Sequence, residues 1–294
     1  MRILLLCLFI LLSACQSRDV SPPPAPIAPQ GRDHSDFGVI RELATGRTIT
    51  PQALVERLAV SPRVLVGEQH DNPDHHALQL WLLRELAKQR PQGSLLMEML
   101  NPDQQAKVDA AQTATRAGQP LADPYQALAW QASWDWGVYG ALVNYALRQP
   151  YPLLAANLDR SQIMQIYQQR PTLNGEASTA RQVQTTLLED IRQSHCGLLP
   201  ESQMPAMLAV QQQRDRRMAE RLIAAPTPAL LLAGAFHVRK DLGVPLHLQD
   251  LGAGQGNAVL ILAEAGKTVA ADSADYVWYT AAQPEEDHCA QLRR

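Results

Sequence analysis

Five short apolar runs, each ending in polar residues, set the strongest constraint on the fold of this 294-residue chain. Short apolar runs separated by helical stretches are typical of buried parallel strands. In such a sheet the ligand site lies off the carboxyl edge, where the loops begin. The sequence therefore predicts an α/β fold in which helices flank a mostly parallel central sheet. The five runs are RVLVGEQH at 63–70, SLLMEM at 94–99, PLLAANLDR at 152–160, ALLLAGAFH at 229–237 and AVLILAEAG at 258–266.

The polar residues at the ends of these runs would meet, because parallel strands present their carboxyl ends at one edge. They are Glu68, His70, Glu98, Asn157, Arg160 and His237. Glu98 needs a partner, since burying a lone carboxylate costs several kcal/mol. Arg160 is the expected partner, either of Glu98 or of a ligand carboxylate; a purely structural ion pair is the alternative. We therefore expect one pocket built from residues remote in sequence.

Histidines are concentrated in GEQHDNPDHH, which ends the first of these runs and continues into a helix. Its Gly-x-x-His spacing, which ends at His70, recurs in GAFH, which ends at His237. A histidine at a helix start faces the positive end of the helix dipole, which favours the neutral imidazole. Neutral imidazole can ligate a metal or accept a hydrogen bond. For His75 and His76, a place in the pocket and a solvated position beside a capped helix remain equally open.

Two long helical insertions, at about 101–149 and 161–224, are expected to form a smaller helical cap domain over the carboxyl edge. The first contains the aromatic stretch WQASWDWGVYGALVNY, in which Trp136, Tyr139 and Val143 share one helical face. Packing between cap and sheet is the simplest interpretation of this stretch. A glycine in the same helix leaves room for a flat ligand, and a tyrosine phenolate suits ferric iron and is a haem ligand type.

The amino terminus has the pattern of a bacterial lipoprotein. An apolar run at 3–12 predicts a secretory signal, because a membrane-spanning helix needs about 20 apolar residues. The run ends on LSAC at 12–15, which resembles a lipobox and implies a signal peptide at 1–14 and palmitate-type lipidation of Cys15. An ordinary small-residue cleavage site is the alternative. By the same resemblance, Gln16 after the cysteine favours the outer membrane, with the body in the periplasm.

Residues 15–36 are rich in proline, serine and charge and have almost nothing to bury. They predict a polyproline-like tether with a rise of about 3.1 Å per residue, so the body would stand tens of ångströms from the membrane. The remaining stretch, 37–294, is long enough for one large α/β domain. The net charge of −3, with no block of lysine or arginine, argues against nucleic acid as a partner.

Two cysteines remain after Cys7 leaves with the signal peptide and Cys15 carries lipid. Cys196 and Cys289 form an even pair in an oxidising compartment, which makes them a disulfide candidate. Two free thiols, or Cys196 acting as a ligand beside His195, remain open, because the sequence does not define their Cα separation.

Seven segments of the chain belong together: GEQHDNPDHH, LLMEM, AANLDR, SHCGLLP, QQQRDRRMAERL, GAFHVRKDLGVPLHL and ADYVWYT. In this order they resemble the ChaN-type haem-binding lipoprotein family, and the resemblance covers almost all of 37–294. This family belongs to the wider Tiki and erythromycin-esterase-like superfamily. The resemblance implies an α/β domain with a smaller helical domain. It also implies haem held between two subunits, with a tyrosine on iron and histidines near the propionates.

The first functional hypothesis is a haem-binding lipoprotein of an iron-acquisition system, receiving or storing ferric haem at the outer membrane. Its expected partners are a second copy of the chain around haem and an outer-membrane haem receptor. Tyr139 is the expected iron ligand, with Tyr145 and Tyr125 as reserves, while Arg160 and a histidine would meet the propionates. The full expected haem-binding set is Tyr139, His75, His76, Asn157, Arg160 and His237.

The second hypothesis is a metal-dependent hydrolase, since the related hydrolases use paired Gly-x-x-His motifs and a glutamate. A divalent metal would lower the pKa of a bound water, and a free glutamate would take its proton. The expected catalytic residues are Glu68, His70, Glu98 and His237. A third hypothesis is an envelope binding or assembly protein with a vestigial pocket.

Overall fold

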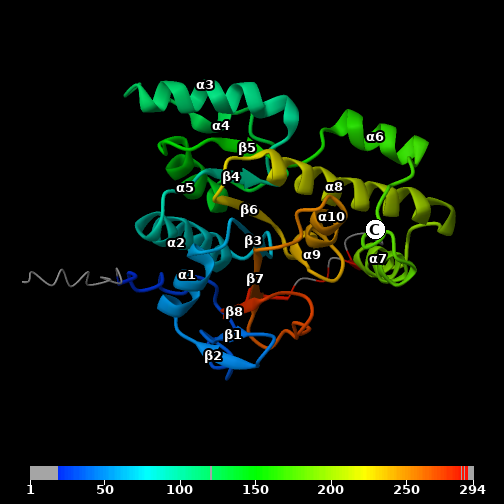
Figure 1. Cartoon of the computed structure of the whole chain (residues 1–294), viewed down its shortest axis with the longest axis horizontal. Coiled ribbons are helices and arrows are strands. Elements are labelled where there is room, and N and C mark those ends of the chain that lie inside the picture. The colour runs from blue at the N-terminus through cyan, green and yellow to red at the C-terminus, as the bar shows by residue number, and fades with distance from the viewer. Residues whose placement is uncertain (1–18, 120, 286, 288, 291–294) are drawn as a thin grey trace, which may run out of the picture.

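The computed structural model describes residues 19–119, 121–285, 287 and 289–290, so the predicted signal peptide and Cys15 lie outside the described residues. Within that part, eight strands form one sheet in the order β2-β1-β8-β7-β3-β6-β4-β5 (Figure 1). Neighbours from β8 to β5 pair in parallel, and β1 and β2 extend the β8 edge as antiparallel strands. The predicted α/β fold with a mostly parallel sheet is confirmed. The strands are β1 (Ile40–Glu42), β2 (Arg47–Ile49), β3 (Arg63–Glu68), β4 (Ser94–Met97), β5 (Leu153–Ala155), β6 (Ala229–Gly234), β7 (Asn257–Glu264) and β8 (Tyr276–Thr280).

The apolar runs form central strands because both faces of the sheet are covered. In β3, Val64 and Val66 belong to one core cluster, and Leu65 between them belongs to the other. In β6, Leu232 lies in the first cluster and Leu231 in the second. A strand buried on both faces needs apolar side chains at every position, which explains why the runs are continuous rather than alternating.

Helices cover the two faces unequally. α1, α2, α3 and α5 contribute to the first core cluster, and α8, α9 and α10 contribute to the second. The helices are α1 (Pro51–Ala59), α2 (Pro73–Gln89), α3 (Gln105–Arg116), α4 (Pro124–Ala127), α5 (Trp136–Leu147), α6 (Arg160–Gln169), α7 (Arg181–Ser194), α8 (Met204–Ala224), α9 (Ala235–Val238) and α10 (Val244–Asp250), with 3-10 turns at Pro102–Gln104 and Glu201–Gln203.

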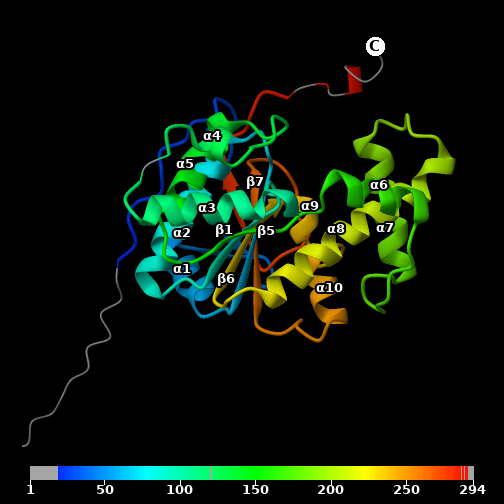
Figure 2. The ribbon, with the colours of Figure 1, turned by 90° about the horizontal axis from the view of Figure 1, so that it is seen from above.

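The two insertions occupy different places. In the first, Val108 of α3 and Leu142 of α5 complete the core on one face of the sheet. Tyr139 of α5 and Trp134 just before it also contact Glu68 and His70, so this insertion covers part of the carboxyl edge as well. The aromatic stretch packs as expected, with Trp130 and Tyr139 buried in the same cluster. In the second insertion, α6 and α7 stand out from the body together with part of α8; we call these three helices the helical arm (Figure 2).

Residues 19–36, which we call the strap, lie along the body. The sequence predicted instead that they would extend freely into solvent. The backbone N–H of Val20 donates to Gln52 on α1 (2.8 Å), Ala28 is buried, and a β-bridge near the end of the strap joins it to Ala282. Proline lacks an N–H donor, but N–H groups of several other strap residues find acceptors on the domain; these residues are Val20, Ser21, Ile27, Ala28 and Gln30. The prediction that this stretch has almost nothing to bury is wrong for its described residues.

A disulfide joins the helical arm to the carboxyl-terminal tail. Cys196, just after α7, is bonded to Cys289 in the carboxyl-terminal tail, with a Cα–Cα separation of 5.6 Å. The predicted pairing is confirmed, and it fastens the helical arm to a segment 93 residues further along the chain. Within the described residues, no helix combines the length and apolar character needed to cross a bilayer.

Reducing this disulfide is expected to lower the free energy of unfolding by about 2–4 kcal/mol, because the long loop it closes would regain its freedom in the unfolded chain. Urea unfolding followed by circular dichroism, with and without reductant, measures the change. A Cys196→Ser/Cys289→Ser double variant is the control and should match the reduced protein in both conditions. Identical unfolding of oxidised and reduced wild-type protein would contradict the prediction.

Candidate functional site

Three neighbouring strands bring acidic and imidazole groups to one place at the carboxyl edge. β3 ends on Glu68, β4 continues directly into Glu98, and β6 leads through Gly234 into α9, which carries His237. A Cβ atom on Gly234 would lie 2.9 Å from Nε2 of His70 and 3.5 Å from Oε2 of Glu98, so only glycine lets these two side chains flank the strand end. The convergence expected from the sequence is therefore present.

Glu68 is a buried carboxylate with partners on both oxygens. Its Oε1 accepts from Nδ1 of His70 (2.9 Å) and from the hydroxyl of Tyr139. Its Oε2 accepts from Nε2 of Gln79 (2.5 Å) and lies 3.2 Å from Nδ1 of His76. Burial by itself would raise the pKa of Glu68, but the hydrogen bonds from His70 and His76 lower it to about 2. Because an ionised carboxylate only accepts, Nδ1 of His70 must carry the proton.

Glu98 is the second buried carboxylate, and its charge is balanced by Arg214 on α8. Nη2 of Arg214 lies 2.7 Å from Oε1 of Glu98, and Oδ1 of Asn157 accepts from Nε of the same guanidinium (3.1 Å). Arg160 is exposed at the first position of α6, so the expected Glu98–Arg160 pair is wrong. α6 leads out into the helical arm, whereas α8 returns and brings Arg214 to the edge of the sheet.

His237 is held between two carboxylates. Its Nδ1 lies 2.5 Å from Oδ1 of Asp215, and its Nε2 lies 3.3 Å from Oε1 of Glu98. Burial alone would lower the pKa of His237, but Glu98 and Asp215 raise it to about 9. His237 is therefore an imidazolium with both nitrogens occupied. The sequence does not single out Asp215 and Arg214, because nothing in QQQRDRR separates them from the other charged residues of α8.

Of the three histidines in GEQHDNPDHH, two are enclosed. Nδ1 of His75 accepts from the N–H of Gln69 (2.8 Å), Nε2 lies 3.0 Å from Oγ1 of Thr280, and burial lowers the pKa of His75 to about 3. His75 is thus a neutral link between α2 and β8 and does not line the pocket. His76 is also buried, and its Nε2 donates to the carbonyl of His70 (2.9 Å). The side chain of His70, by contrast, is 41% exposed.

Tyr139 lies behind His70 and does not face open space. It is only 1% exposed, its hydroxyl donates to Glu68, and that oxygen lies 3.2 Å from Nδ1 of His70. Burial and the nearby charge of Glu68 raise the pKa of Tyr139 far above its ordinary value, which disfavours a phenolate. The reserve residues lie elsewhere: the ring of Tyr145 contacts Arg84 on α2, and Tyr125 contacts a tryptophan of α5.

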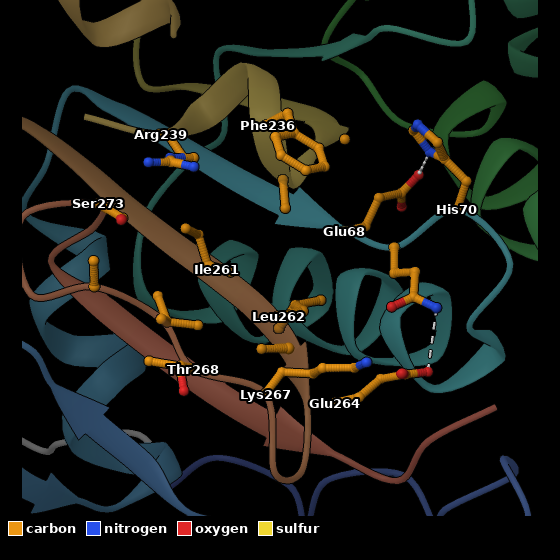
Figure 3. A pocket seen from close by; sticks show the side chains of 16 residues that line it. Glu68, His70, Phe236, Arg239, Ile261, Leu262, Glu264, Lys267, Thr268 and Ser273 are labelled. Carbon is orange, nitrogen blue, oxygen red and sulfur yellow. Dashed lines mark hydrogen bonds and ion pairs between the residues drawn. The ribbon is translucent and has the colours of Figure 1, made fainter. Parts of the chain in front are cut away.

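Two cavities open beside His70. The larger, of about 460 Å³, lies between α9, β7 and the loop after β7 (Figure 3). The smaller, of about 170 Å³, lies between α7 and α9. Phe236, which is 61% exposed, lines both. Apolar side chains such as Ile261 form much of the larger wall, with Arg239 and Lys267 on opposite sides (Figure 3). An apolar hollow with a few placed polar groups is the usual form of a small-molecule site.

The acidic and imidazole groups of the site do not form a recognisable metal centre. Among the described residues, no group of three or more His, Cys, Asp or Glu side chains is arranged to hold a metal ion. The four residues expected to be catalytic instead bond to one another and to neighbouring side chains, as described above. The free atom that this network leaves beside the cavities is Nε2 of His70.

The charge on His237 should make stability depend on pH. Because its pKa rises from 6.5 to about 9 on folding, its stabilising contribution is present below pH 6.5 and is lost as pH rises to about 9. We expect the free energy of unfolding to fall by about 1–3 kcal/mol across this range. Urea unfolding at several pH values measures it, and His237→Gln should flatten the dependence. Equal pH dependence in both proteins would contradict the assignment.

Comparison with known proteins shows which family this chain belongs to. Residues 54–248 match the family described as haem-binding uptake, Tiki superfamily, ChaN. The structure titled cofacial heme binding to ChaN of Campylobacter jejuni is similar with a TM-score of 0.75 and 30% identity, covering 84% of this chain and 98% of that chain. An erythromycin esterase in its open conformation has a TM-score of 0.47 and 12% identity, covering 86% of each chain. No curated protein sequence matches significantly. The chain belongs to the ChaN family of the Tiki superfamily.

Proposed function

We propose that this protein binds haem. The observation that carries the proposal is its 30% identity, over 84% of the chain, to a ChaN protein whose structure is titled for cofacial haem binding. The family description, haem-binding uptake, points in the same direction. When bound, haem would supply a ferric iron and two carboxylates on a flat apolar ring. The residues beside His70 must therefore offer an apolar wall, cations and an iron-facing atom.

The larger cavity meets these requirements. Its volume of about 460 Å³ is within the range usual for small-molecule sites. The exposed ring of Phe236 and the side chain of Ile261 offer apolar surface to a flat ring. Arg239 and Lys267 would meet the carboxylates, in place of the exposed Arg160. Lys267 forms no ion pair with any other described residue, so its charge is available.

His70 is the residue whose geometry best suits the iron. Glu68 holds its Nδ1–H, which leaves the lone pair of Nε2 directed away from that carboxylate. A histidine oriented by a carboxylate in this way is a common arrangement for a metal ligand. The resemblance to the family favours a tyrosine ligand instead. For Tyr139 to serve, its hydroxyl would have to leave Glu68, lose its proton and become exposed.

Titration of the apo protein with haemin should give a saturable Soret shift. We expect His70→Ala to weaken binding by at least about tenfold, equivalent to roughly 1.4 kcal/mol, and to move the Soret maximum because an iron-facing nitrogen is lost. Tyr139→Phe should have a smaller effect, since it removes one hydrogen bond to Glu68. Lys267→Gln should weaken binding most at low salt.

Tyr145→Phe, remote from both cavities, is the matched control and should bind haem like the wild-type protein. A spectral change in Tyr139→Phe with an unchanged His70→Ala spectrum would restore tyrosine ligation and reject His70. Absence of any saturable shift with micromolar wild-type protein would reject haem binding itself.

We further propose that the protein is an outer-membrane lipoprotein of iron acquisition, anchored through Cys15 with its body in the periplasm. The LSAC sequence at 12–15 supports the anchor. We also propose a homodimer around haem that exchanges haem with an outer-membrane receptor. Phe236, which is 61% exposed and lines both cavities, would be covered by haem or by the partner subunit in such a dimer.

A second candidate function is hydrolysis, and the geometry of His70 favours a form that needs no metal. Glu68 holds Nδ1–H of His70, so Nε2 could take a proton from a water that attacks an ester. His237, as an imidazolium bound to Glu98 and Asp215, could not act as such a base but could stabilise negative charge. The metal-dependent form of this alternative has no group of three suitable side chains among the described residues to support it.

Hydrolysis predicts turnover of model esters that persists in EDTA. His70→Ala should lower kcat by at least about 100-fold, because general-base catalysis contributes roughly 10²–10⁴-fold. His34→Ala, at an exposed strap residue, is the matched control and should leave kcat unchanged. Ester turnover at the same rate in His70→Ala would exclude this mechanism.

A further inference from the structure

The folded body begins very close to the proposed lipid anchor. The backbone N–H of Ser21 donates to Oε2 of Glu85 (3.1 Å), and its carbonyl accepts from Nε1 of Trp81 (3.0 Å). Together with the bond from Val20 to Gln52, these contacts fix the start of the strap on α1 and α2. The domain is therefore held from Val20 onward, and not from the end of the proline-rich stretch.

Docking continues along the strap, so the proline-rich stretch cannot extend freely. The N–H groups of Ile27 and Ala28 both donate to Oδ1 of Asp74 (2.5 and 3.4 Å). Asp74 and Glu85 are buried carboxylates, and lifting the strap would remove partners from both. Each of these hydrogen bonds has a charged acceptor, which makes it stronger than a bond between neutral groups, so the docked strap is the stable state.

Chain length then limits the distance between anchor and body. Five residue steps separate Cys15 from Val20. A fully extended chain spans at most about 3.6 Å per residue, which places the start of the domain within about 18 Å of the lipidated sulfur. A free polyproline tether over the 21 steps from residue 15 to residue 36 would reach about 65 Å.

We infer that the end of the domain formed by α1 and α2 lies against the lipid surface itself. The inference rests on the proposed lipidation of Cys15. In both views, α1 and α2 lie at one end of the molecule and α6 and α7 of the helical arm lie at the other (Figure 1, Figure 2). The strap therefore presents the α1–α2 end to the bilayer and turns the arm into the surrounding solution.

Depth-dependent quenching tests this orientation on the full-length lipidated protein. Ala87 is exposed on α2 beside Lys88, whose Nζ donates to Oγ of Ser21 (2.7 Å), and Met164 is 47% exposed on α6. Ala87→Cys and Met164→Cys would each be labelled with a fluorophore and reconstituted in phosphatidylethanolamine–phosphatidylglycerol vesicles that carry a headgroup quencher. We expect quenching at least about threefold stronger at position 87, because short-range quenching requires the label to lie near the headgroups. Equal quenching, or stronger quenching at position 164, would overturn the inference.

Lengthening the anchor provides the second test. A flexible Gly-Ser insertion of about 20 residues between positions 18 and 19 should lift the body and reduce quenching of the Ala87→Cys label to the level at position 164. Unchanged quenching would contradict the inference, because the length of the anchor would then not determine the contact between the α1–α2 end and the lipid surface. A Cys15→Ala variant should not co-sediment with vesicles. Co-sedimentation of that variant would overturn lipid anchoring and this inference together, while haem titration in solution tests the proposed ligand separately.

Discussion

Two buried carboxylates, Glu68 and Glu98, determine which side chains meet at the carboxyl edge of the sheet. Each would cost several kcal/mol if left alone, so the fold surrounds both with donors drawn from distant elements. Gln79 of α2 and Tyr139 of α5 serve Glu68, while Arg214 of α8 serves Glu98. The need to satisfy these two charges joins helices from both faces of the sheet at a single point.

The same requirement decides what each histidine can do. Both nitrogens of His237 bind carboxylates, those of Glu98 and Asp215, so this residue is a cation with no free nitrogen. His75 is a neutral residue that links α2 to Thr280 of β8. His70 keeps one nitrogen free because Glu68 binds only the other. A site that contains several imidazoles therefore offers one reactive nitrogen to its cavities. The proposed ligation of haem by His70 and the alternative, hydrolysis, would both use that atom.

The strap and the last described residues are held by the same body. The strap forms a β-bridge with Ala282, and the following residue, Gln283, donates its N–H to Glu264 at the rim of the larger cavity (2.8 Å). The tail then reaches Cys196 at the end of α7 through the disulfide. The strap, the cavity rim and the helical arm are thus linked to one another, so the orientation imposed by the proposed anchor would extend to the site.

The sequence by itself determined the parallel sheet and the meeting of Glu68, Glu98 and His237, because continuous apolar strands impose both on any chain with this order of elements. It also made Cys196 and Cys289 a disulfide candidate, which the structure confirms. It did not identify Arg214 in place of Arg160, the enclosure of Tyr139, or the docking of the strap. Those features depend on the course of α6 and α8 and on which backbone donors find acceptors across the surface. Only tertiary packing decides such contacts, since equivalent polar residues along a helix or loop differ solely in what the fold brings beside them.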